Sequence, residues 1–178
     1  EQIIAGEGIG FYEDWVNGEV TSATDTKLLD ALDTFKTYLD YVNPDHAALT
    51  WDQAIAKVIT GTAAFSVMGD WANGEFLVAE KVYGTDYGTF PTPGTADMYG
   101  LCIDCFQHPK GVAHPANSLK WLRVVGSKEG QDAFNPLKGS IACRTDADTT
   151  KYGPYQQAAI DDFTTVVTYM YPSVTHGS

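Results

Sequence analysis

The stretch "FSVMGDWANGEF", residues 65–76, joins an apolar run to an acid and a large aromatic residue. The apolar run predicts a buried β-strand over 63–68 that stops at Gly69. Asp70 and Trp71 follow at once, at the tip of this strand. Asp70 can cap a helix that begins here, while Trp71 packs against its first turn. Alternatively, the pair suits a sugar, whose hydroxyls need acceptors and whose C–H face needs a flat aromatic platform.

Helical periodicity lies on both sides of this stretch. The pattern predicts a helix over 25–42 with Asp25 as its N-cap, and a shorter helix over 51–60 that Gly61 ends. A third helix is predicted over 71–82. The expected inward positions are Leu28, Leu32, Phe35, Leu39 and Val42 in the first helix, and Ala54, Ile55, Val58 and Ile59 in the second.

The run "PTPGTADM", residues 91–98, is the clearest break in composition, because two prolines and a glycine fall within four residues. It predicts a crossover between two lobes. Short strands are predicted on either side, at "YGTF" (87–90) and at "YGLCID" (99–104). The stretch "YPSVTHGS", which begins at Tyr171, is expected to be irregular.

Three further helices are predicted in the second half of the chain. Pro115 and Pro154 each occupy the first position of a helix, and Ser127 caps a short helix over 128–135. The expected inward positions are Leu119, Leu122, Val125, Ile160, Phe163, Val166 and Val167, and Trp15 and Trp121 are expected in the core. Strands that alternate with helices predict an α/β fold.

The chain has 178 residues, of which 44% are hydrophobic, so its composition allows a packed core. Its net charge is −12, with 11 basic residues scattered among 23 acidic ones. Nucleic-acid binding is disfavoured, because phosphate contacts require clustered Lys and Arg. No apolar run reaches the ~18–20 residues of a membrane span. The chain begins "EQIIAGEG" without Met, which is expected of a processed protein or a piece of a longer one.

The cysteines are Cys102, Cys105 and Cys143. The C-x-x-C spacing of the first two lacks the second ligand pair that zinc requires. A loop sequence follows them, whereas a thioredoxin-type motif opens a helix. We expect one disulfide instead, between Cys143 and either of the other two, as in an oxidising compartment. No metal or cofactor is expected.

Four other residues carry candidate ligand contacts. Asp104 ends the "YGLCID" strand, and ligands of α/β sheets bind beyond the carboxyl ends of strands. Lys138 supplies donors beside Gly139, which lets the backbone approach a partner closely. His176 in "THGS" offers both a donor and an acceptor. Trp51, at a helix start, either faces a cleft or packs into the core, and the core is slightly favoured. Caps, turns and solvated side chains are the simpler explanations for each.

A hydrolase is the alternative function. Two carboxylates that flank a glycosidic bond carry out its hydrolysis, and Asp70 with Asp104 can supply such a pair. No Ser-His-Asp order, phosphate loop or metal motif accompanies them. The stretch "GEGIGF" lacks a preceding strand and a Lys-Ser/Thr ending, so it is interpreted as a turn.

Four motifs follow one another along the chain: "GTAAFSVMGDWANGEF", "YGTFPTPGT", "SKEGQDAFNPLKGSI" and "PSVTHGS". Together and in this order they resemble the extracytoplasmic sugar-binding proteins of bacterial ABC transporters, closest to the glucose and mannose receptors of the maltose-binding-protein-like family. The resemblance implies a periplasmic-binding-protein type II fold, with two α/β lobes joined by hinge crossings around a sugar cleft. Residues 1–92 would belong to the C-terminal-type sugar-binding lobe, 93–171 to a segment that returns to the N-terminal-type lobe, and 172–178 to the second crossing.

The resemblance also implies a function and its residues. The protein would bind a hexose without catalysis, as a monomer in the periplasm or anchored outside the cytoplasm, and deliver it to a membrane permease. Trp71 would stack on the sugar, and Asp104, Lys138 and His176 would bind hydroxyls. Trp51 lines the cleft in some members of the family.

Two departures from the family limit what carries over. Family members usually read "SIPAR" where this chain has Ile141-Ala142-Cys143-Arg144, so the resemblance says nothing of the cysteines. The opening part of the family and its closing helices are absent, so the chain resembles the middle of a receptor. We therefore expect micromolar or better binding for a whole receptor and weak binding for these 178 residues alone.

Overall fold

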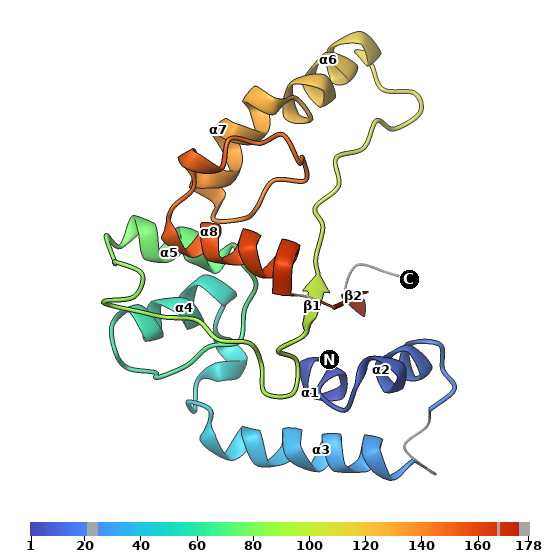
Figure 1. Cartoon of the computed structure of the whole chain (residues 1–178), viewed down its shortest axis with the longest axis vertical. Coiled ribbons are helices and arrows are strands. Elements are labelled where there is room, and N and C mark those ends of the chain that lie inside the picture. Colours follow the sequence, from blue (N-terminus) through green and yellow to red (C-terminus); the bar gives the residue numbers. More distant parts are fainter. Residues whose placement is uncertain (21–24, 167, 175–178) are drawn as a thin grey trace. The chain divides into compact units, whose positions relative to one another are not determined.

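The computed structural model describes residues 1–20, 25–166 and 168–174 (Figure 1). The chain divides into two compact units. Unit 1 comprises Glu1–Val67, Gly88–Cys102 and Asp162–Ser178, and unit 2 comprises Met68–Tyr87 and Ile103–Asp161. Helices and strands both occur, as the predicted α/β class requires. The lobe boundaries expected from the resemblance stay a prediction.

Three helices and a strand enclose the core of unit 1. The helices are α1 (Gln2–Ala5), α2 (Ile9–Val16) and α3 (Thr26–Tyr38), and α1 packs against the other two (Figure 1). The predicted cap of α3 is confirmed, since the Asp25 carboxylate accepts a hydrogen bond of 3.0 Å from the amide of Leu28. The buried core residues are Ile4, Ala5, Tyr12, Leu28, Ala31 and Tyr171, and Trp15 packs against them as predicted.

The predicted apolar face of α3 is only partly buried. Leu28 lies in the core, whereas Leu32 is 45% exposed and Phe35 is 49% exposed. Regular α-helix ends at Tyr38, and the 3₁₀ turn Leu39–Tyr41 follows. The periodicity therefore located the helix correctly but overstated how much of its face is covered by the described residues.

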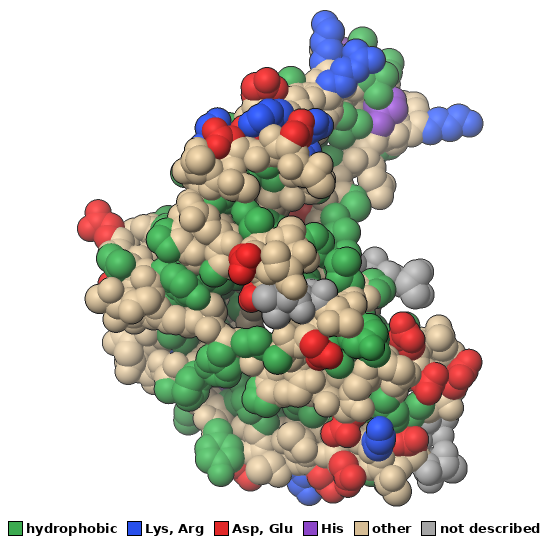
Figure 2. Space-filling model, viewed as in Figure 1, with side chains coloured by type: hydrophobic (Ala, Val, Ile, Leu, Met, Phe, Trp, Pro, Cys, Tyr) green, Lys and Arg blue, Asp and Glu red, His purple; other side chains and the backbone are tan. Residues whose placement is uncertain are grey.

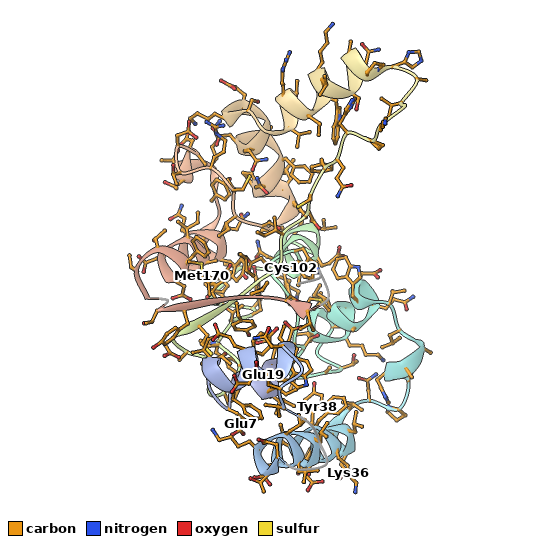
Figure 3. The ribbon with its side chains drawn as sticks, turned by 90° about the vertical axis from the view of Figure 1, so that its right-hand side faces the viewer. Glu7, Glu19, Lys36, Tyr38, Cys102 and Met170 are labelled. Atoms are coloured by element: carbon orange, nitrogen blue, oxygen red, sulfur yellow. The ribbon has the colours of Figure 1, made fainter. Side chains whose placement is uncertain are left out.

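A parallel pair of strands completes unit 1. The strands are β1 (Met98–Leu101) and β2 (Tyr169–Pro172), paired from Met98 with Tyr169 to Leu101 with Pro172. The Tyr12 hydroxyl donates to the Pro172 carbonyl at 3.0 Å, which ties β2 to α2. Figure 3 labels Met170 on β2 and Cys102 directly after β1. The expectation of irregular backbone from Tyr171 was wrong at this strand, because pairing with β1 extends it.

The strands predicted over 63–68 and 87–90 are absent from the structure. Neither stretch forms a strand: Tyr87 makes only an isolated bridge with Tyr83, and Phe65 is 74% exposed. Their aromatic side chains meet instead, since the rings of Phe65 and Phe90 lie edge to face at 5.9 Å. A strand needs a partner for its amides and carbonyls, and none of the described strands supplies one here.

The second predicted helix is α4 (Trp51–Ile59) in unit 1. Ile55 is buried and its predicted inward neighbours are half-buried, so the predicted face is confirmed. Gln53 reaches back to accept a hydrogen bond of 3.0 Å from the amide of Thr50, which fixes the helix start. Trp51 is 44% exposed, so the slight preference for a core position was wrong.

Unit 2 is helical. Its helices are α5 (Ala72–Val78), α6 (Pro115–Val125), α7 (Lys128–Lys138) and α8 (Pro154–Asp161), and a π-helical turn, Asp162–Val166, follows α8 in unit 1. The predicted starts at Pro115, Ser127 and Pro154 are confirmed. Ser127 accepts a hydrogen bond of 3.0 Å from the amide of Gly130. Trp121 on α6 is 51% exposed, so its predicted core position was wrong.

Two helix ends in unit 2 differ from the prediction. The helix α5 stops at Val78, before Glu80 adopts a positive φ of 55°. The helix α7 continues through Pro136 to Lys138, where the pattern predicted an end at 135. Lys138 is therefore the last residue of this helix.

Candidate functional site

The tip residues Asp70 and Trp71 stand directly before α5. Trp71 occupies the N-cap position of α5, and its ring lies over the backbone of Gly69. A Cβ atom at Gly69 would meet the ring at 2.3 Å, so only glycine allows this placement. The Asp70 carboxylate atom Oδ1 accepts a hydrogen bond of 2.5 Å from the Tyr155 hydroxyl. The carboxylate beside the indole is thus held by a residue 85 positions further along the chain.

Lys138 lies at the C-terminal end of α7, beside the start of α5. A Cβ atom at Gly74 would lie 3.0 Å from the Lys138 carbonyl oxygen. Gly139 follows in the left-handed region, at φ 92°, and a Cβ atom there would lie 2.7 Å from the Gly74 amide nitrogen. Two glycines therefore let the backbones of the two helices touch, and this contact brings Lys138 to the tip residues.

Asp104 lies in an extended segment of unit 2. The strand β1 ends at Leu101, so Asp104 is not at a strand end as predicted. Its Oδ2 atom accepts a hydrogen bond from Nζ of Lys138, and the two side chains form an ion pair. The side chains are 62% and 28% exposed respectively, which leaves them within reach of a ligand from solvent. Nζ of Lys138 also lies 5.9 Å from the centroid of the Phe134 ring.

A cluster of aromatic rings packs beside α5. The Tyr87 hydroxyl donates to Oδ1 of the buried Asn73 at 2.5 Å, and its ring stacks on Phe76 with centroids 4.0 Å apart. Tyr83 packs edge to face against both Tyr87 and Tyr155. Burial raises the pKa of the Tyr87 hydroxyl, so this hydroxyl stays protonated and donates at neutral pH.

Gln156, like its neighbour Tyr155 on α8, was not among the site residues predicted from the sequence. Its side chain is fully buried, and Nε2 donates at 2.9 Å to the carbonyls of both Asn135 and Ser140. These carbonyls lie on either side of Lys138 in the sequence. A buried amide with both bonds made is well satisfied, and it fixes the end of α7. The sequence "PYQQ" indicates the start of a helix, but it does not indicate which carbonyls the Gln156 side chain binds.

Asp132 joins α7 to the segment that follows it. Its side chain is 3% exposed and pairs with Nζ of Lys128 at 2.5 Å, while Oδ1 accepts from the amide of Asp148 at 2.9 Å. The Lys128 ammonium, followed by the Asp148 amide, holds the pKa of the Asp132 carboxyl below its usual value. This carboxylate is structural, because its partners occupy both of its oxygens.

The cysteines do not form the expected disulfide. No disulfide joins any two of Cys102, Cys105 and Cys143 in the structure, and Sγ of Cys143 lies 3.4 Å from the side-chain oxygen of Gln131. Among the residues that the structure describes, no three His, Cys, Asp or Glu side chains gather as a metal site. No helix in the described part of the chain is long and apolar enough to cross a membrane.

Unit 2 thus brings together four of the six predicted site residues. Asp70, Trp71, Asp104 and Lys138 combine an aromatic surface, two carboxylates and an ammonium group. This set can stack on an apolar face and exchange hydrogen bonds with hydroxyl groups. Trp51 belongs to unit 1, and His176 lies outside the described residues. The role of every one of these residues remains a prediction.

Several known proteins are similar to this chain in sequence. The model of the bacterial extracellular solute-binding protein family matches residues 1–132. An uncharacterized ABC transporter extracellular-binding protein of Pyrococcus horikoshii is 45% identical over 99% of this chain and 39% of its own length. The xylose/arabinose-binding protein XacG of Haloferax volcanii is 30% identical over 99% of this chain and 38% of its own length.

A probable sugar-binding periplasmic protein of Rhizobium meliloti is 31% identical over 99% of this chain and 44% of its own length. The chain spans about two fifths of the length of these relatives. The family model covers well over half of the chain. The chain therefore belongs to the family of bacterial extracellular solute-binding proteins.

Proposed function

We propose that unit 2 carries part of the hexose-binding site of an extracytoplasmic receptor that delivers its sugar to an ABC transporter permease. The observation that carries this proposal is the grouping of Trp71, Lys138 and Asp104 in one unit. Backbone contacts at Gly74 and Gly139 place Lys138 beside the tip residues, and an ion pair joins Lys138 to Asp104. The receptor acts as a monomer outside the cytoplasm.

Each group has a distinct part in sugar binding. The indole of Trp71 is the platform for the C–H face of the ring. The Asp104 carboxylate accepts from two hydroxyls, and the Lys138 ammonium donates to a ring or hydroxyl oxygen. Because each of these hydrogen bonds replaces one with water, a single contact contributes only about 1 kcal/mol. Affinity therefore requires many such groups, and these residues supply a share of them.

The family and the ion pair both favour binding over hydrolysis. Members of this family bind solutes and are typically not enzymes. A general acid must release a proton to the leaving group, whereas the Asp104 carboxylate is ion-paired with Lys138. The relatives include one named as a xylose/arabinose-binding protein and one as a probable sugar-binding protein, so pentoses are the natural competitors of hexoses in a test.

The experiment is a saturation-transfer NMR titration of the chain with glucose, mannose, xylose and arabinose, because this method detects weak binding. We expect saturable transfer from the protein to glucose or mannose. It should disappear in Trp71→Ala and persist in Trp121→Ala, which removes a half-exposed indole from another helix of the same unit. Stronger transfer to the pentoses would overturn the choice of hexose.

The same samples test the alternative function, a hydrolase that uses Asp70 and Asp104. Incubation with aryl glycosides should release no reducing sugar while binding stays saturable. Release that Asp104→Asn abolishes would establish the hydrolase instead. Transfer that is equal in the chain and in Trp71→Ala would contradict the proposed platform.

A further inference from the structure

We propose that the α8 pair, Tyr155 and Gln156, are positioning residues that fix the two halves of the proposed sugar site relative to each other. The inference rests on the proposed function. The two halves are the tip residues at the start of α5 and Lys138 at the end of α7. Neither residue of the α8 pair was indicated by the sequence as part of a site.

Tyr155 holds the first half. Its hydroxyl donates to Oδ1 of Asp70 at 2.5 Å, and its ring packs edge to face on Tyr83 at 5.6 Å. Asp70 is covalently next to Trp71, whose ring can tilt only as far as the backbone of Gly69 permits. A fixed carboxylate therefore limits the rotation of the peptide that carries the indole. A charge-assisted bond of this kind is stronger than one between neutral groups.

Gln156 holds the second half. Its amide donates to the carbonyls of Asn135 and Ser140, which flank Lys138 by three and two residues. Because Gln156 is fully buried, these bonds are not exchanged with water. They set where α7 ends and therefore where the stem of Lys138 leaves the helix. The side-chain amide acts on Lys138 only through this backbone.

The two side chains are consecutive on the first turn of one helix. Asp70, the partner of Tyr155, lies two residues before α5, whereas Asn135 and Ser140, the partners of Gln156, lie in α7 and two residues beyond it. The backbones of α5 and α7 also touch each other at Gly74 and Gly139. Three helices therefore form a closed set of contacts, in which a shift of α8 moves both halves. Adjacent residues on a helix point about 100° apart, which is how one turn reaches two partners.

The first readout needs no ligand. We would assign the indole N–H resonance of Trp71 by its loss in Trp71→Phe and then record it in Tyr155→Phe. This variant keeps the ring that packs on Tyr83 and removes only the hydroxyl. The matched control is Tyr87→Phe, which removes a hydroxyl bond of the same length to Asn73 in α5. We expect the resonance to shift or broaden in Tyr155→Phe and to stay in place in Tyr87→Phe.

The second readout is sugar affinity. Tyr155→Phe should weaken glucose binding by roughly five-fold, the effect of one lost hydrogen bond. Added to Asp70→Ala, it should have no further effect, because the same bond is already gone. Gln156→Leu should weaken binding as well, whereas Gln157→Leu, which loses only a bond to the Tyr152 carbonyl, should not. Thermal unfolding of each variant shows whether the chain is still folded, so that weaker binding caused by unfolding is told apart from weaker binding caused by displaced site residues.

The outcomes separate the two proposals. If no sugar binds the unmodified chain, the proposed function fails, while the Trp71 resonance still reports whether Tyr155 positions the indole. If sugar binds but Tyr155→Phe changes neither the resonance nor the affinity, the positioning role is overturned and the function stands. Equal effects of Tyr155→Phe and Tyr87→Phe would also overturn it, since that result reports general stability.

Discussion

At the scale of single residues, the position of the Trp71 indole depends on the absence of a side chain at Gly69. The ring covers the Gly69 backbone, and a side chain there would collide with it at 2.3 Å. The colliding atoms belong to the end of a side chain, which can rotate away. Glycine is therefore required here for the direction of the indole rather than for the backbone.

We predict that Gly69→Ala turns the Trp71 indole without unfolding the chain. Fluorescence quenching by acrylamide should increase, and glucose affinity should fall by roughly ten-fold with the lost stacking. Gly88→Ala is the control, because nothing lies within 4 Å of a Cβ atom there. Unchanged quenching and affinity in Gly69→Ala would show that the ring direction does not matter.

Residue types in the sequence located most of the candidate site but not its support. Asp70 and Trp71 were conspicuous because an acid and an aromatic residue follow an apolar run. Tyr155 and Gln156 were not, because their partners lie in other parts of the chain, Asp70 before α5 and Asn135 in α7. Pairings of this kind depend on tertiary packing, which a single sequence does not encode locally.

A second residue-scale prediction concerns acid stability. The pKa of Asp132 is held low by Lys128 and by the Asp148 amide, so its charge stabilises the folded state above pH ~4. This contribution is lost as the pH falls through the lowered pKa. Asp132→Asn should reduce stability at pH 7 and make unfolding by urea less dependent on pH between ~5 and ~2.

The control for this prediction is Glu129→Gln, an exposed acid on the same helix. Its stability should follow that of the unmodified chain over the whole pH range. An Asp132→Asn variant with the full acid sensitivity of the parent would show that other carboxylates govern acid unfolding.

At the scale of elements, local signals predicted helices well and strands poorly. Asp25 and Ser127 cap the starts of α3 and α7, because a cap satisfies amides within a few residues of itself. Pro115 and Pro154 stand at the first positions of α6 and α8, where a missing amide costs nothing. The run over 63–68 has strand composition, yet no described strand lies beside it to accept its hydrogen bonds. The strand β2 forms where the pattern indicated irregular chain, because β1 supplies the partner.

The contact between α5 and α7 gives the third prediction. Gly139→Ala should destabilise the chain by about 1–3 kcal/mol, since alanine is strained at positive φ and its Cβ would meet the Gly74 backbone. Gly84→Ala has the same strain, but open space surrounds it. The difference between the two variants in the free energy of unfolding by urea therefore measures the contribution of the helix contact apart from backbone strain.

If this contact positions Lys138, Gly139→Ala should also lower sugar affinity in the folded fraction, and Gly84→Ala should not. Equal losses of stability in the two variants would mean that backbone strain alone accounts for the effect. The contact would then have no part in holding the site.

At the scale of the whole molecule, acidic groups dominate. The net charge of the chain is −12, and the basic side chains of unit 1 are limited to Lys27, Lys36 and Lys57. Figure 2 shows acidic side chains over the helices α2 and α3, and separately shows basic ones over α6. The proposed site carries two carboxylates, those of Asp70 and Asp104, and one ammonium group, that of Lys138. A neutral ligand suits this balance better than an anionic one.

The fourth prediction follows from this charge. Glucuronate, which differs from glucose by a carboxylate, should bind more weakly than glucose at low ionic strength. The difference should shrink as salt is added, because salt screens the repulsion. Titrations of both sugars at two salt concentrations measure it. Tighter binding of glucuronate would mean that Lys138 acts as an anion receptor, contrary to its pairing with Asp104.

The parallel pairing of β1 with β2 has a consequence for how the chain acquires its fold. The larger part of unit 2, Ile103–Asp161, lies in the sequence between these two strands, so their pairing closes a long loop. Closing such a loop costs chain entropy that grows with the length left unstructured. Helices formed early within unit 2 shorten that length. The order of events is then helices first and the sheet last, and the sheet sets the pace of folding.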